Sequence, residues 1–164
     1  MSIVLLAIGL LLVLLIILIR TGPSGHLFAD AQFLNVDLAG LFLKGAPFED
    51  LRKEFLRKIR EKHELLIYSF RNLLSEFKNS PVFPRLTSES QESLEGAITV
   101  SNAFLGGEYT NIESPDYLYL DAKIDLSRCT PEERATWKSF RSKIDSWDKE
   151  ALTMTGIYKR WSRA

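Results

Sequence analysis

The sequence predicts a mainly α-helical protein, in which one N-terminal transmembrane helix precedes a small helical-bundle domain with an irregular acidic segment. Three observations support this fold class. Residues 3–19 form an uninterrupted apolar run, apolar residues then recur every three or four positions, and Gly- and Pro-rich breaks separate these stretches. The expected divisions are a transmembrane anchor at 1–20, a juxtamembrane turn and apolar segment at 21–46, and a soluble helical domain at 47–164.

The composition excludes several classes of protein. Among 164 residues, 21 Lys and Arg balance 21 Asp and Glu, so the chain is not a globally basic nucleic-acid binder. Outside the apolar run, roughly 40% of the residues are hydrophobic, as in an ordinary soluble domain. The single cysteine, Cys129, excludes an intrachain disulfide and any CxxC metal or redox motif, and it fits a reducing compartment.

The apolar run from Ile3 to Ile19 is expected to remain in the protein as a membrane anchor. As a helix, its 17 residues span about 25 Å, near the short end of a bilayer crossing. A cleaved signal peptide is one alternative, but its small-x-small cleavage site would come late, at Ala29–Ala31. A buried core helix is the other, but it would normally have a polar face. Because Arg20 follows the run, the positive-inside rule favours the cytoplasmic side for the soluble part.

The segment from His26 to Gly45 is unusually apolar for a linker. One helical face collects Leu27, Ala31, Leu34, Leu38 and Leu41. This pattern fits either a helix in the soluble core or an interfacial helix at the membrane surface or against a partner's transmembrane helices. The polar side carries Asp30 and Asp37, which favours protein over lipid headgroups. We therefore predict that Leu34, Leu38 and Leu41 bind another membrane subunit.

A long helix is expected next, from Pro47 to about Lys78. Its apolar stripe follows the helical period, and His63 is expected to interrupt it. The other faces are rich in Lys and Arg, with seven basic and four acidic residues between Lys44 and Lys62. Such a basic run is usually a solvated helix face, although near an anchor it is also suited to anionic lipid headgroups.

A second helix is expected to start after Thr87 or Ser88 and to end at Gly106. Ser88 and Gln91 form a capping-box pattern at its start. An irregular stretch from Glu108 to Cys129 follows. Residues 89–125 carry eight acidic residues and one lysine, so this part either pairs with the basic helices around it or faces a basic partner.

The last helix, expected over 131–161, has the best-marked start in the chain. Thr130 is placed as its N-cap, Pro131 as its first residue and Glu133 as its third. An apolar seam then follows at steps of three and four, formed by Trp137, Phe140, Ile144, Trp147, Ala151, Met154, Tyr158 and Trp161. The seam fits an intramolecular bundle core, an exposed stripe that binds a partner through its three tryptophans, or a helix lying on a membrane.

The sequence lacks familiar catalytic motifs. P-loop, dinucleotide-binding, zinc-protease, serine-hydrolase and EF-hand patterns do not occur, and the two SxxK matches are about what chance provides. The two histidines, His26 and His63, lack the neighbours that would complete a metal site. We therefore expect no metal, no cofactor, no nucleic-acid partner and no enzymatic activity.

Two functions from different classes remain. The first is a single-pass membrane protein whose helical domain binds other membrane protein subunits, as an accessory or assembly subunit of a larger complex. The second is a membrane-delivered enzyme or toxin-like effector that uses carboxylates of the 108–125 segment. A cleft that holds two carboxyls with raised pKa values would favour the second function.

Overall fold

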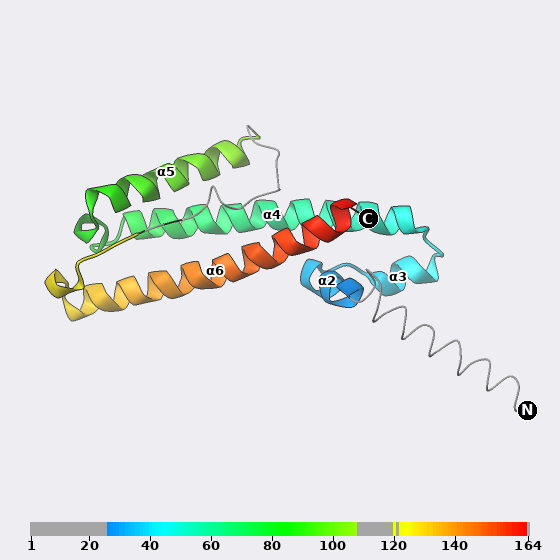
Figure 1. Ribbon diagram of the computed structural model, residues 1–164, viewed down its shortest axis with the longest axis horizontal. Coiled ribbons are helices and arrows are strands. Elements are labelled where there is room, and N and C mark those ends of the chain that lie inside the picture. Colours follow the sequence, from blue (N-terminus) through cyan, green and yellow to red (C-terminus); the bar gives the residue numbers. More distant parts are fainter. Residues whose placement is uncertain (1–25, 108–119, 121, 164) are drawn as a thin grey trace, which may run out of the picture. The chain divides into compact units, whose positions relative to one another are not determined.

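The computed structural model describes residues 26–107, 120 and 122–163, and these residues are mainly helical (Figure 1). The helices are α2 (Leu27–Leu34), α3 (Leu38–Leu43), α4 (Phe48–Lys78), α5 (Ser88–Leu105) and α6 (Pro131–Arg163), with short 3-10 helices η2 (Phe83–Arg85) and η4 (Leu126–Arg128). The predicted helical class is therefore confirmed for this part of the chain. The predicted anchor at 3–19 lies outside the described residues. Within the described part, none of the helices combines the length and the hydropathy that a bilayer crossing requires.

The described residues form two units by their packing. The first unit consists of residues 26–58 and 160–163, and the second of residues 59–107, 120 and 122–159. Helices α4 and α6 contribute residues to both units. The apolar segment at 26–46 therefore packs in one unit with the first turns of α4 and the last residues of α6.

In the first unit, the apolar segment folds as two short helices instead of one continuous helix. Asn35 ends α2 in the left-handed conformation, with φ of 55°, which asparagine tolerates better than most residues. The backbone N–H of Val36 then donates to the carbonyl oxygen of Ala31 at 2.8 Å. Asp37 caps α3 by accepting from the backbone N–H of Gly40 at 2.9 Å. The apolar spacing alone could not reveal this break.

The core of the first unit is built around an aromatic pair. The rings of Phe55 on α4 and Trp161 on α6 stack with their centroids 3.8 Å apart and their planes at 17°. Further buried apolar side chains complete this core, namely Ala31, Leu34, Val36, Leu38 and Leu51. Four apolar side chains of the 26–46 segment are thus buried inside the chain, namely Ala31, Leu34, Val36 and Leu38.

In the second unit, α4 lies between α5 and α6 and runs antiparallel to both (Figure 1). Its buried stripe consists of Ile59, His63, Leu66, Ile67, Phe70, Leu74 and Phe77. The expected interruption at His63 is wrong, because this ring is only 4% exposed and packs edge-on against Phe104 of α5, with centroids 4.8 Å apart. The neutral imidazole is apolar enough to continue the stripe.

The helix starts in the second unit follow the predicted chemistry closely. Thr130 Oγ1 accepts from the backbone N–H of Glu133, and Glu133 Oε2 accepts from that of Thr130 at 2.7 Å, so the predicted capping box of α6 is confirmed. Helix α5 begins at Ser88 as expected, but its N-cap is Thr87, which accepts from Ser90. The Gln91 side chain instead donates to the carbonyl oxygens of Phe83 and Leu86.

Candidate functional site

The predicted contact residue Trp161 lies inside the first unit, in a polar network centred on Asp30. The Asp30 carboxylate is 3% exposed and accepts from the Trp161 indole N–H at 2.9 Å. It also accepts from both Nε and Nη2 of Arg160, so carboxylate and guanidinium form a two-pronged pair. Arg52 closes the network by donating to the carbonyl oxygens of Trp161 and Ser162, each at 3.2 Å. These contacts hold α2 and α4 against the end of α6.

The three leucines predicted to bind a membrane subunit do not form an exposed face. Leu34 and Leu38 are buried, and Leu41 is half-buried. The apolar side chains that the first unit presents to its surroundings are instead Phe28, Phe42, Leu43 and Phe48. The exposed apolar residues of the first unit thus differ from the predicted leucine stripe.

The two other predicted tryptophans differ in their accessibility. Trp147 is buried against Phe70, and its indole N–H donates to the Leu66 carbonyl oxygen at 2.8 Å. Because Trp147 lies on α6 and Leu66 on α4, this bond joins the two helices. Trp137 is half-buried beside Phe77 and Phe140, near the start of α6. Most residues of the predicted seam are therefore buried, namely Phe140, Ile144, Trp147, Ala151, Met154 and Trp161.

The outer face of α4 in the second unit carries an unexpected surface cluster of Leu65, Tyr68 and Arg71. Leu65 is 64% exposed and Tyr68 is 51% exposed, although both are large apolar residues. The Arg71 guanidinium lies over the Tyr68 ring, 4.6 Å from its centre, and also donates to Asn72 Oδ1 at 2.8 Å. These contacts hold the half-buried Arg71 guanidinium against the exposed ring. The sequence could have indicated this exposure, since Leu65 and Tyr68 fall outside the apolar stripe of the helix.

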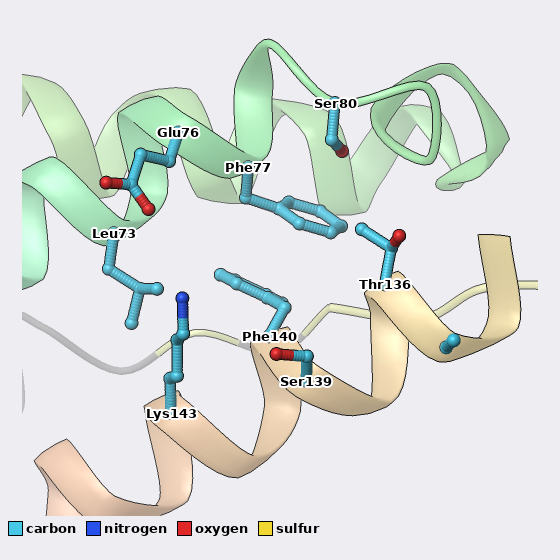
Figure 2. A pocket seen from close by; sticks show the side chains of 9 residues that line it. Leu73, Glu76, Phe77, Ser80, Thr136, Ser139, Phe140 and Lys143 are labelled. Atoms are coloured by element: carbon cyan, nitrogen blue, oxygen red, sulfur yellow. The ribbon is translucent and has the colours of Figure 1, made fainter. Parts of the chain in front are cut away.

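A pocket of about 440 Å³ opens between α4 and α6 in the second unit (Figure 2). It is lined by Leu73, Glu76, Phe77, Ser80, Ala135, Thr136, Ser139, Phe140 and Lys143. Figure 2 shows the rings of Phe77 and Phe140 facing each other at its centre, and their centroids are 3.9 Å apart. The Ser80 hydroxyl is shielded from solvent and has no hydrogen-bond partner among the described residues. The pocket lining thus combines two aromatic rings with the hydroxyls of Ser80, Thr136 and Ser139.

The pKa values of several described groups are shifted, those of His63 and Asp125 downward and that of Asp148 upward by burial and the nearby Asp145. Burial lowers the pKa of His63 to about 4, so this side chain is neutral at physiological pH. Of the carboxylates at 108–125, Asp125 is described, and hydrogen bonds from the Ser127 side chain and backbone lower its pKa, the opposite of the shift expected for a general acid. The others, Glu108, Glu113, Asp116 and Asp121, lie outside the described residues.

Within residues 26–107, 120 and 122–163, no three His, Cys, Asp or Glu side chains gather closely enough to hold a metal ion. Comparisons of the chain with models of protein families, with curated proteins and with solved structures found no match.

Proposed function

We propose that this chain is a single-pass membrane protein whose helical domain binds other membrane protein subunits, as an accessory or assembly subunit of a larger complex. Residues 3–19 would cross the bilayer, and Arg20 would keep the helical domain on the cytoplasmic side. The observation that carries the proposal is the cluster on α4 of the exposed Leu65 and Tyr68 with the half-buried Arg71.

The cluster has the chemistry of a protein contact. Tyrosine and arginine are enriched among the residues that contribute most to binding, because each combines a large contact area with specific hydrogen bonds. Here the guanidinium stacks on the ring, so the two side chains already share one arrangement and would lose little conformational freedom on binding. The opposite face of the same helix turn is fully used by Leu66, Ile67 and Phe70 in the bundle core. The exposed residues are therefore not needed to hold the bundle together.

The nature of the partner follows from the apolar run. A helical domain tethered to a bilayer by residues 3–19 meets mostly proteins that share that membrane, and tethering raises their effective concentration. A stable contact needs roughly 800 Å² from each partner, so the cluster would form the centre of a larger surface on α4.

Replacement of Tyr68 by Ala in the full-length protein tests the proposal. If the ring is a central contact, its loss weakens partner binding by about 2 kcal/mol, or roughly 30-fold. The measurement is quantitative co-purification of associated membrane proteins from mild detergent. Leu152→Ala on α6 is the matched control, because Leu152 is also a large exposed residue, at 66% exposure.

Both variants should melt like the original chain, because neither side chain is buried. Loss of partners in Tyr68→Ala but not in Leu152→Ala is the expected result. If Tyr68→Ala, and also the double variant Leu65→Ser with Tyr68→Ala, retains every partner at the original level, the α4 cluster is not the contact.

A further inference from the structure

The turn between α3 and α4 presents the most exposed large apolar side chain of the described chain. Leu43 is 89% exposed, Phe42 beside it is 55% exposed, and Phe48 at the start of α4 is 53% exposed. Lys44 is the single charged residue between Leu38 and Phe48. We call residues 41–48 the apolar turn. Its surface therefore combines three exposed apolar side chains with one lysine.

The apolar turn is closed by hydrogen bonds and is not a frayed helix end. The backbone N–H of Gly45 donates to the carbonyl oxygen of Phe42 at 3.0 Å, and that of Ala46 donates to the carbonyl oxygen of Leu41 at 3.1 Å. Gly45 has φ of +62°, a conformation that favours glycine and that this pattern of helix ending requires. The N–H groups of Gly45 and Ala46, which would be costly to bring unpaired near lipid, are thus paired within the turn.

Contacts inside the first unit hold the apolar turn in place from both sides. Leu38 is buried at the start of α3, and the Phe48 ring stacks against Trp161 with centroids 6.3 Å apart. The outward direction of Phe42 and Leu43 is therefore a property of the folded unit. Adjacent exposed apolar groups of this kind commonly mark a contact.

The acidic residues that disfavoured a lipid contact in the sequence are not part of the apolar turn. Asp30 is buried and paired with Arg160 and Trp161 in the first unit. Asp37 caps α3 at the end opposite the turn. The acids that follow Phe48 in α4 face basic neighbours, since Asp50 lies 3.8 Å from Lys53 and Glu49 lies 3.9 Å from Arg52.

Chain length keeps the first unit close to the proposed anchor. Six residue steps separate Arg20 from His26, where the described chain begins, and an extended chain covers about 3.4 Å per step. His26 therefore lies within about 20 Å of Arg20, the residue that follows the apolar run. The unit that carries the apolar turn is thus the part of the described chain nearest in sequence to the bilayer.

From these observations we infer that the apolar turn inserts Phe42 and Leu43 into the boundary between lipid headgroups and acyl chains, with Lys44 reaching back to the headgroups. This inference rests on the proposed anchor at 3–19. A lipid contact fits the turn because its exposed surface combines apolar side chains with one lysine, and because the first unit follows the proposed anchor in sequence. Lysine beside apolar residues is well suited to the interface, where its stem is buried and its ammonium is solvated.

Depth-dependent fluorescence quenching in vesicles tests the inference without any partner protein. The full chain with Cys129→Ser carries a single new cysteine, Leu43→Cys, labelled with an environment-sensitive dye. It is reconstituted into phosphatidylcholine vesicles with or without nitroxide-labelled phosphatidylcholine. The control label is at Leu152→Cys, another highly exposed leucine, on α6. Circular dichroism checks that both labelled chains keep their helix content.

We expect the label at 43 to be quenched several-fold more strongly than the label at 152, with its emission shifted to the blue. Equal quenching at the two positions, or none at 43 in a chain that resists carbonate extraction, would overturn the inference while leaving the anchor intact. A chain that carbonate releases from the vesicles would overturn both the anchor and the inference. A label at Phe42→Cys should behave like the one at 43, and its failure to do so also contradicts the insertion of the turn.

Discussion

At the scale of single residues, Asp30 is the polar group on which the first unit depends most. Asp30→Ala removes the acceptor for Arg160 and for the Trp161 indole, and it leaves a buried N–H without a partner. Removing one member of a fully buried ion pair costs about 3–5 kcal/mol, but the Arg160 side chain is 37% exposed and can be hydrated. We therefore expect a loss of about 2–3 kcal/mol, measured by chemical denaturation followed by tryptophan fluorescence.

Asp37→Ala is the control for Asp30, because it removes the other aspartate of the same segment. Asp37 is exposed and makes one capping bond to Gly40, so its loss should cost about 1 kcal/mol. Equal effects of the two substitutions would contradict the role of Asp30 as the centre of a buried network.

His63 should make the second unit sensitive to mild acid. Its pKa is lowered by burial to about 4 in the folded chain, whereas an unfolded histidine titrates near 6.5. Between these pH values the unfolded chain therefore binds more protons than the folded chain. The free energy of unfolding has its full value above about pH 6.5 and falls as the pH drops toward 4. With allowance for solvent screening in a small bundle, the loss is on the order of 2 kcal/mol. Urea denaturation at a series of pH values measures it.

Two histidine variants separate this effect from general acid sensitivity. His63→Gln removes the titrating group and should flatten the dependence of the unfolding free energy on pH in this range. His26→Gln, which removes the other histidine at an exposed position, is the matched control. A His63→Gln chain that keeps the original pH dependence would mean that other groups cause it.

At the scale of the elements, the packing of α6 against α4 should dominate the stability of the second unit. Phe140 is 4% exposed and stacks on Phe77 at 15°, so Phe140→Ala should cost roughly 3–5 kcal/mol, toward the lower value because the adjoining pocket lets neighbours relax. Leu152→Ala on the same helix should change the stability by less than about 0.5 kcal/mol. Thermal and urea unfolding of both variants measure the difference, and a near-neutral Phe140→Ala would contradict this packing.

The bounds of the long helices could be predicted from the sequence because local chemistry determines them. The expected start at Pro47 and end at Lys78 agree with α4, and the Gly106 stop agrees with the end of α5. The capping box of Thr130 and Glu133 is formed by residues three apart, so it needs no tertiary information. The break at Asn35 was missed, because apolar residues continue at helical spacing on both sides of it.

The direction in which each apolar residue faces could not be predicted, because it depends on what the rest of the chain packs against it. Leu34 and Leu43 look equivalent in the sequence, yet one is buried in the first unit and the other is almost fully exposed. His63 was expected to break a stripe that it continues, since burial depends on Phe104 of a distant helix. Leu65 and Tyr68, by contrast, were recognisable as apolar residues outside the stripe.

At the scale of the whole molecule, the proposed anchor decides whether the other surfaces act at a membrane. The nearest cleavage site for a signal peptidase, Ala29–Ala31, lies within α2. Asp30 and Ala31 are buried there, and cleavage would separate residues that help to build the first unit. A processed chain that began at Asp30 or Gln32 would start with a truncated α2 and a weakened core. The fold of the first unit thus argues for retention of the N-terminal run.

We accordingly predict that the mature protein keeps residues 1–19 and remains in the membrane. Intact mass spectrometry of the purified chain should give the mass of the full sequence, and extraction with alkaline carbonate should leave the protein in the membrane pellet. A variant with Leu11 and Leu14 replaced by Arg should move to the soluble fraction, because each central arginine adds about 2.5–3.5 kcal/mol to the insertion free energy. Since neither position belongs to the described units, the released variant should retain the unfolding midpoint of the original helical domain. Recovery of a shorter native chain starting near Asp30 would contradict the anchor and would place the helical domain on the exported side.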